Sequence, residues 1–130
     1  MPNGDVKLKF LHICEQTIIS SDDKVSIINI FSGISTKGFP VIHPKFCVVA
    51  NVKGPVGRYK ESIEIISPDE KSIIKVEGEI EIKGEGGNNF VGNFINTLFN
   101  TEGKYWIKVV VDSAFLTSKD EHFILVKKSI

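Results

Sequence analysis

The sequence IKVEGEIEIK, residues 74–83, decides the fold class. Apolar side chains at Ile74, Val76, Ile80 and Ile82 alternate with charged ones. Successive side chains of a strand point to opposite faces of its sheet, so this pattern predicts an antiparallel strand with one core face and one charged solvent face. Gly78 interrupts the apolar face, and we expect a β-bulge there.

The composition extends this prediction to the whole chain of 130 residues, which has 19 Ile and 13 Val but 5 Leu and 2 Ala. β-branched side chains favour strands, whereas Ala and Leu favour helices. The ratio excludes a helical bundle and an α/β fold with crossover helices. Hydrophobic residues make up 42% of the chain, which argues against disorder. The length suits a single domain over residues 1–130.

Apolar runs separated by Gly, Pro, Asn and Asp recur along the chain, which is typical of all-β proteins. Pro40 and Pro44 argue against a regular central strand over residues 38–44, so we expect a crossing loop anchored by Phe39 and Ile42. The fold class predicted is an all-β antiparallel β-sandwich with immunoglobulin- or fibronectin-like Greek-key connections, and a C2-like or jelly-roll topology is the alternative. The expected strands cover residues 6–14, 25–34, 46–53, 59–67, 74–83, 90–100, 103–112, 114–116 and 122–128.

The segment Gly103-Lys104-Tyr105 opens one of the last strands. A Tyr at the corner of a sandwich commonly donates a hydrogen bond to backbone a few residues upstream, and we expect this of Tyr105. The Cys-Trp-Cys pattern of true immunoglobulin domains is absent from the sequence. This segment therefore supports a sandwich without indicating that family.

Three segments, residues 8–15, 24–34 and 39–46, resemble a family of small uncharacterised bacterial proteins defined only as a domain of unknown function. The Pro68-Asp69 turn and residues 103–105 continue the likeness, so it extends over most of the chain. The resemblance implies a small cytoplasmic sandwich domain, and it brings no activity with it.

Charge and targeting signals narrow the partners and the compartment. The formal net charge is zero and the pI is about 6.8, so we expect no general attraction to nucleic acid or to anionic lipid. Residues 1–5 are mostly polar, and no basic segment followed by an apolar run predicts a signal peptide. The longest apolar run, residues 46–50, is too short to span a membrane. We therefore expect a cytoplasmic protein.

Candidate metal ligands and nucleophiles are few. His12 and Cys14, with His43 and Cys47, could be a zinc set, but their spacing matches no known ligand pattern. Either Cys could pair with its neighbouring His, but the sequence offers no third group to orient the pair. Residues 84–87 lack the Lys-Ser/Thr of a phosphate loop. We expect buried reduced thiols, no metal, no cofactor and no enzymatic activity.

The runs over residues 25–31 and 90–99 are apolar on both faces. Such strands need a covering loop or a partner, so the leading hypothesis is a non-catalytic interaction module that binds a protein partner or self-associates as a homo-oligomer. The alternation over 103–112 turns Trp106 away from the core beside Lys104 and Lys108, which makes these three a candidate interaction surface. The alternative is that a neighbouring loop covers this face.

A second hypothesis is a small-ligand site in the end loops of the sandwich. Its candidate residues are Phe39 and His43, together with the Gly-rich loop Gly84–Asn89. Loops on a rigid β scaffold often carry binding residues, which favours this placement.

Overall fold

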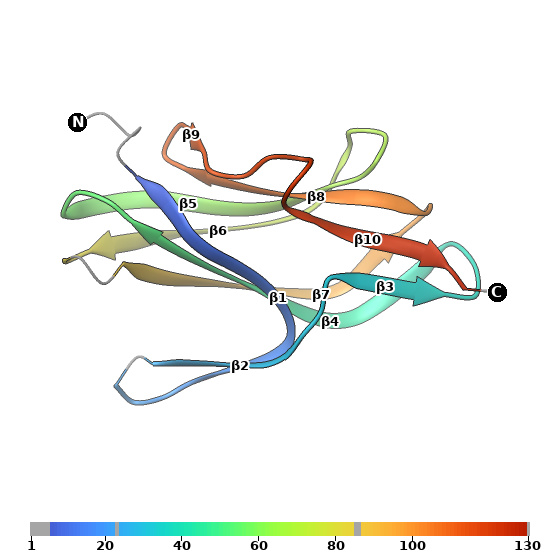
Figure 1. Ribbon diagram of the computed structural model, residues 1–130, viewed down its shortest axis with the longest axis horizontal. Helices are drawn as coiled ribbons and strands as arrows, with labels where there is room; N and C mark the ends of the chain where they lie inside the picture. Colours follow the sequence, from blue (N-terminus) through green and yellow to red (C-terminus); the bar gives the residue numbers. More distant parts are fainter. Residues whose placement is uncertain (1–5, 23, 85–86, 130) are drawn as a thin grey trace.

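The protein is described from a computed structural model that covers residues 6–22, 24–84 and 87–129, and these form two stacked β-sheets (Figure 1). The all-β prediction is confirmed. No described segment forms a helix long and apolar enough to cross a membrane. The strands are β1 (Lys7–Ile19), β2 (Val25–Ile30), β3 (Gly33–Thr36), β4 (Val41–Lys53), β5 (Gly57–Ile66), β6 (Ser72–Ile82), β7 (Asn88–Phe99), β8 (Gly103–Val111), β9 (Ala114–Phe115) and β10 (Phe123–Lys128).

Sheet A has the strand order β2-β1-β4-β7, and sheet B has the order β3-β10-β8-β5-β6, with β9 paired to β8. After β4 the chain crosses to sheet B, forms the β5–β6 hairpin and returns to sheet A, where β7 pairs with β4. Neighbours in one sheet are thus joined through the other sheet. The strand pairs are antiparallel except β3 with β10, which run parallel. Sheet B is therefore mixed, whereas the sequence predicts an antiparallel sheet.

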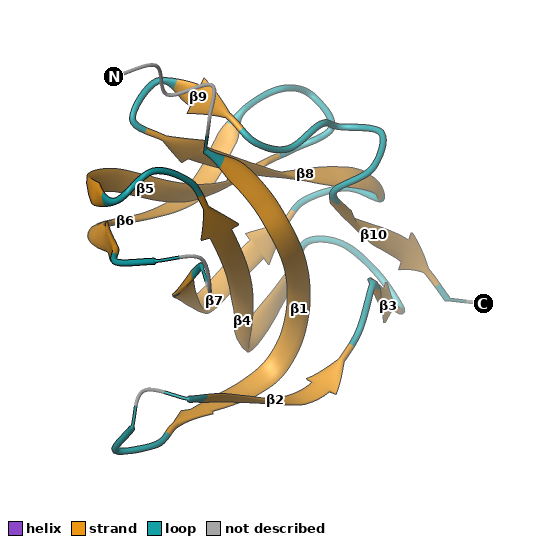
Figure 2. Cartoon of the chain, turned by 60° about the vertical axis from the view of Figure 1, so that its left-hand side comes forward, coloured by secondary structure: helices purple, strands orange, loops and turns teal. Residues whose placement is uncertain are grey.

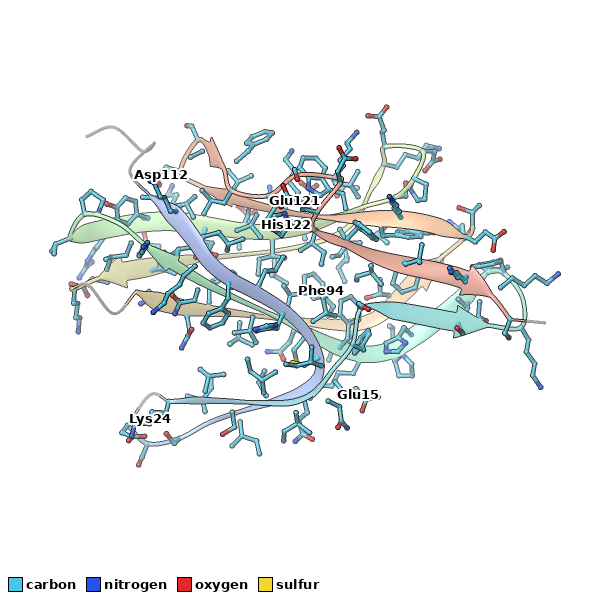
Figure 3. The ribbon with its side chains drawn as sticks, in the orientation of Figure 1. Glu15, Lys24, Phe94, Asp112, Glu121 and His122 are labelled. Carbon is cyan, nitrogen blue, oxygen red and sulfur yellow. The ribbon has the colours of Figure 1, made fainter. Side chains whose placement is uncertain are left out.

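Aromatic side chains fill the main core between the sheets. Phe46 and Phe94, on neighbouring strands of sheet A, stack with ring centroids 5.1 Å apart. Phe99 meets Tyr105 of sheet B edge to face at 4.8 Å. Figure 3 labels Phe94 between the two layers. All four side chains are essentially fully buried, and each such burial stabilises the fold by roughly 2–3 kcal/mol.

The strand that decided the fold class is β6, with Ile80 and Ile82 buried as the alternation predicts. The bulge expected at Gly78 is wrong, because the pairing of β6 with β5 stays in register through that residue. Gly78 instead makes room for an aromatic ring: a Cβ at this position would lie 2.9 Å from Cε1 of Phe90 on β7. The glycine lets the edges of the two sheets approach each other.

The crossing loop expected over residues 38–44 is partly wrong, because β4 begins at Val41 and contains Pro44. Pairing between β1 and β4 ends at Cys14 opposite Cys47, so β4 is paired only with β7 among the described strands at Pro44. A residue without an amide hydrogen is tolerated there, as it is on an edge strand.

The anchors expected in this segment are half correct. Phe39 packs against the main core, but Ile42 is 57% exposed and Val41 occupies the core side in its place. The two prolines of residues 38–44 predict a loop, and a loop carries no two-residue alternation of its side chains. Once β4 starts at Val41, alternation turns Ile42 to the outer face of sheet A.

Asn96 explains why the sequence left the register of β7 ambiguous. The φ of Asn96 is 52°, which lies in the left-handed region that Asn tolerates better than most residues. The alternation therefore shifts at this residue, so Phe94 and Phe99 are both buried while Ile95 and Leu98 are both exposed. A strict two-residue period could not place all four side chains.

The β1–β2 hairpin, residues 14–30, bends away from β4 and β7 and folds across the outer face of these two strands (Figure 2). Its strand β2 contributes Val25 and Ile27 to a small apolar cluster outside the main core. The chain itself thus covers part of the apolar surface that the sequence showed on both faces of β2. We call this group the covered thiol cluster; its members are Phe10, Cys14, Val25, Ile27, Cys47, Val49 and Val91.

The predicted tyrosine corner is confirmed. The Tyr105 hydroxyl donates a hydrogen bond of 2.7 Å to the backbone carbonyl of Thr101 and accepts one of 3.3 Å from its amide. This contact fixes the chain where it enters β8, next to the core ring of Phe99.

Candidate functional site

Trp106 lies on the outer face of sheet B, half buried, with its inward-facing neighbours on β8 in the core as predicted. Lys108 Nζ lies 5.7 Å from the centroid of the Trp106 ring and 4.7 Å from that of Phe115. Lys104 instead lies over Phe123, at 4.7 Å. The structure therefore brings Lys108 to Trp106 and directs Lys104 to a different ring.

The segment after β9 contributes a residue that the sequence reasoning missed. Lys119 Nζ lies 5.7 Å from the Trp106 ring centroid and 2.7 Å from Glu70 Oε1, and this pairing lowers the pKa of Glu70. The indole nitrogen of Trp106 is buried, and no residue that the structure describes forms a hydrogen bond with it. A neighbouring loop thus covers part of this face, which was the alternative interpretation of Trp106.

Phe39 lies just before β4 and His43 near the start of this strand, and both pack on the core side of sheet A. The His43 ring packs against Phe31 and Phe46, with centroids 6.1 and 5.7 Å away. This position leaves His43 beside an open hollow of about 420 Å³ on one side. The hollow is lined by Glu15, Asn29, Ile30, Phe31, Gly33, Ile34, Ser35 and His43.

The structure does not bring the two halves of the predicted end-loop site together. Val41 at the start of β4 pairs with Phe99, whereas Val52 near its end pairs with Asn88. Phe39 and His43 therefore lie at one end of the β4–β7 pair and the Gly-rich loop at the other end. Within that loop, Glu85 and Gly86 lie outside the described residues.

An apolar patch remains uncovered on the outer face of sheet A. Ile42 and Leu98 are directly opposite each other on β4 and β7, and they are 57% and 42% exposed. Ile95 of β7 is 58% exposed and lies opposite Lys45. We call Ile42, Ile95 and Leu98 the β4–β7 patch. Its signal in the sequence was the two-sided apolar run over residues 90–99.

The strand β7, which carries most of this patch, contains no charged residue and pairs with β4 alone among the described strands. Exposed edge strands usually carry charges or Pro that discourage pairing with another chain. The edge strand of the other sheet follows that rule, since β6 carries Lys75, Glu77, Glu79 and Glu81. The edge at β7 lacks this protection.

The four residues weighed as metal ligands or catalytic pairs do not all come together. His12 lies beside Phe10 on β1, with ring centroids 5.2 Å apart. Cys14 and Cys47 lie together in the covered thiol cluster, whereas His43 lies among core rings. The Cys47 thiol donates a hydrogen bond to Oδ1 of Asn93 at 3.1 Å. Among residues 6–22, 24–84 and 87–129, no three His, Cys, Asp or Glu side chains group so as to hold a metal ion.

Glu61 is a buried acid whose importance the sequence reasoning missed. It is 1% exposed on the core face of β5, opposite Gly78 and Val111 of the flanking strands. Neither carboxylate oxygen has a hydrogen-bond partner among the described residues, and burial raises the pKa of Glu61 to about 8. The signal was present, because alternation over 59–65 puts this acid on an apolar face.

Comparison with known proteins adds the family and no activity. A search of curated proteins finds no match. A family model matches residues 9–120, and its description is "family of unknown function (DUF6941)". The matched residues include every strand from β2 to β9 and most of β1. This agrees with the resemblance found in the sequence, and the chain belongs to the DUF6941 family.

Proposed function

We propose that this chain is a non-catalytic interaction module whose partner is a second copy of itself, docked at the β4–β7 patch. The observation that carries the proposal is the exposed pair Ile42 and Leu98, directly opposite each other beside Ile95 on a strand without charges. Exposed apolar groups on adjacent strands lose contact with water when a partner covers them, which favours association.

A second copy suits this surface because β7 can pair with its own counterpart. Two antiparallel β7 strands would bring no like charges together, since the strand has none. The new backbone hydrogen bonds would continue sheet A into the partner, and a two-fold axis would place each patch beside the other. Backbone pairing and apolar contact would then act at the same place.

A non-catalytic role is supported by the state of the candidate nucleophiles. Cys14 and Cys47 are fully buried, and burial raises the pKa of the Cys14 thiol, with the nearby Cys47 adding to the effect. A thiol needs thiolate character and access to substrate in order to act as a nucleophile. The geometry of the cluster favours neither.

The test is light scattering coupled to size-exclusion chromatography, over a range of protein concentrations and under reducing conditions. The wild-type chain is expected to shift from monomer to dimer with concentration, and Leu98→Glu and Ile95→Lys are expected to stay monomeric. The matched control is Val56→Lys, which changes a 72% exposed apolar residue before β5, away from the patch. A wild-type chain that stays monomeric at every concentration, or a dimer that both patch variants retain, would refute the proposal.

A second candidate function, binding of a small ligand, is favoured by the hollow beside His43. Its volume of about 420 Å³ falls in the range of small-molecule sites, roughly 300–1,000 Å³. Glu15 accepts a hydrogen bond of 2.7 Å from Asn29 at its rim, and Phe31 supplies an aromatic wall. A fragment library screened by NMR should shift the signals of His43 and Ile30 and leave Val56 unchanged; shifts spread evenly over the chain would count against a site.

A further inference from the structure

Cys14 and Cys47 are directly opposite each other on β1 and β4. Both are fully buried, and both belong to the covered thiol cluster on the outer face of sheet A. The Cys47 side chain lies near enough to Cys14 to add to the rise in the pKa of the Cys14 thiol that burial causes. Because the residues come from distant parts of the sequence, this contact depends on the fold.

The backbone geometry suits a bond between the two sulfur atoms. Directly opposite residues in an antiparallel pair have Cα atoms about 4.5–5.5 Å apart. A disulfide is compatible with Cα separations of about 4.4–6.8 Å. Cys14 and Cys47 could therefore be joined without moving β1 relative to β4.

The cover over the thiols is held to β4 and β7 mainly by side chains. Cys14 opposite Cys47 is the last pair between β1 and β4, so the rest of the hairpin departs from sheet A at the cysteines. Beyond this point Val25 and Ile27 pack over the cluster, and the Thr17 hydroxyl lies 4.0 Å from the sulfur of Cys47. Figure 3 labels Glu15 near the bend and Lys24 at the far tip of this hairpin. Segments held this way open locally without global unfolding.

We propose that Cys14 and Cys47 are an oxidative modification site, at which a peroxide converts the two thiols into an intramolecular disulfide when the β1–β2 hairpin lifts off sheet A. One thiolate attacks a peroxide oxygen, the O–O bond breaks, and a sulfenic acid and the first water form. The second thiol attacks the sulfenic sulfur, the S–O bond breaks, and the second water leaves. The two thiols lose two electrons and two protons, and one hydrogen peroxide becomes two waters.

The product would tie β1 to β4 at the point where the hairpin departs. The closed packing over the cluster keeps the peroxide away from the thiols. Burial also raises the pKa of Cys14, so the thiol stays neutral and reacts poorly while the hairpin is closed. The rate of oxidation is then set by how often the hairpin opens. This inference does not depend on the proposed self-association.

The experiment treats the reduced full chain with hydrogen peroxide, blocks free thiols with iodoacetamide at intervals and measures the intact mass. The expected product is a monomer that has lost two hydrogen atoms, takes up no iodoacetamide and yields a linked peptide pair containing Cys14 and Cys47. Cys14→Ala and Cys47→Ala should each abolish this product. Ile27→Ala should speed its formation about tenfold, because fewer buried methyl groups hold the hairpin down.

The control for the hairpin is Ile18→Ala, an exposed residue of β1 whose removal should leave the rate unchanged. Should Ile27→Ala fail to fold, Val25→Ala tests the same cover two residues earlier on β2. The proposal is overturned if the folded chain keeps both thiols while the urea-unfolded chain oxidises. It is also overturned if the product is a cross-linked dimer or two separate sulfinic acids, or if the cover variants oxidise at the wild-type rate.

Discussion

Glu61 offers the sharpest test of the structure, because a buried carboxyl without a partner makes folding depend on pH. The unfolded chain ionises this residue above its ordinary pKa of about 4.5, whereas the folded chain keeps it neutral up to about pH 8. Between these values the unfolded state has given up a proton that the folded state still holds. The free energy of unfolding must therefore fall as the pH rises through this interval.

The magnitude follows from the width of the interval. Each pH unit within it removes about 1.4 kcal/mol of stability, so the total between the two pKa values of Glu61 is about 5 kcal/mol. The full stability is present below pH 4.5, and above about pH 8 the loss from this group is complete. A loss of this size is a large share of the total stability of an ordinary domain, about 5–15 kcal/mol.

The perturbation is Glu61→Met, which keeps the length of the side chain and removes its charge. We expect the variant to be more stable than the wild type at pH 8 by several kcal/mol, and the advantage to shrink toward pH 5. Urea unfolding between pH 5 and 8.5, followed by the fluorescence of the single tryptophan, Trp106, measures both curves. A reductant in the buffer prevents oxidation of the two cysteines from altering the measured stability.

The control is Glu64→Gln, which removes an acid from the opposite face of the same strand, where it lies 4.0 Å from Lys108. This variant should keep the pH slope of the wild type, because Glu61 is untouched. Equal slopes for the wild type and Glu61→Met would refute the reasoning and would mean that Glu61 reaches water or a partner in the folded chain.

Two further substitutions test the packing and the hydrogen bonds of sheet B. Gly78→Ala should lower the free energy of unfolding by about 1–3 kcal/mol, because the new Cβ would lie 2.9 Å from the Phe90 ring, whereas Gly38→Ala, with open space around it, should have little effect in the same urea titration. Thr117→Val should cost about 1–3 kcal/mol in thermal unfolding, because the Thr117 hydroxyl donates to a carbonyl of β8 at 2.6 Å and accepts from an amide of β8 at 3.0 Å. Thr117→Ser should retain most of the stability, and equal losses for both Thr117 variants would contradict this account.

The regular strands were predictable because their alternation is strict. The charged and apolar faces of β6, and the inward side chains of β8, follow directly from a two-residue period. The tyrosine corner at Tyr105 was also predictable, since the motif is local and its hydrogen bond to Thr101 reaches only four residues back. Where structure depends on near neighbours in the sequence, the pattern was enough.

The misplaced features depend on contacts between distant strands. Pro44 is tolerated in β4 because β1 has already turned away, and nothing near Pro44 in the sequence reports this. The ring that fills the space at Gly78 comes from Phe90, on another strand in another sheet. The meeting of Cys14 with Cys47 requires the register between β1 and β4.

In the candidate site, too, features set by local sequence were predictable and features set by distant segments were not. The outward position of Trp106 was predictable from alternation, but its cover, which includes Lys119, comes from a loop after the next strand. The surplus apolar surface of β7 is predictable from the sequence. The exposed side chain of Ile42, which lies opposite Leu98 in the same patch, is not, because the prolines on either side of it predict a loop.

The parallel pairing of β3 with β10 has a consequence for how the chain is made. Residues 33–36 leave the ribosome early, whereas their partners at 125–128 arrive several seconds later at roughly 5–20 residues per second. Until then β3 has no neighbour in its sheet, and Ile124 and Val126 are missing from the core. A nascent or prematurely terminated chain therefore presents an open sheet edge, which chaperones and proteases can distinguish from the finished protein.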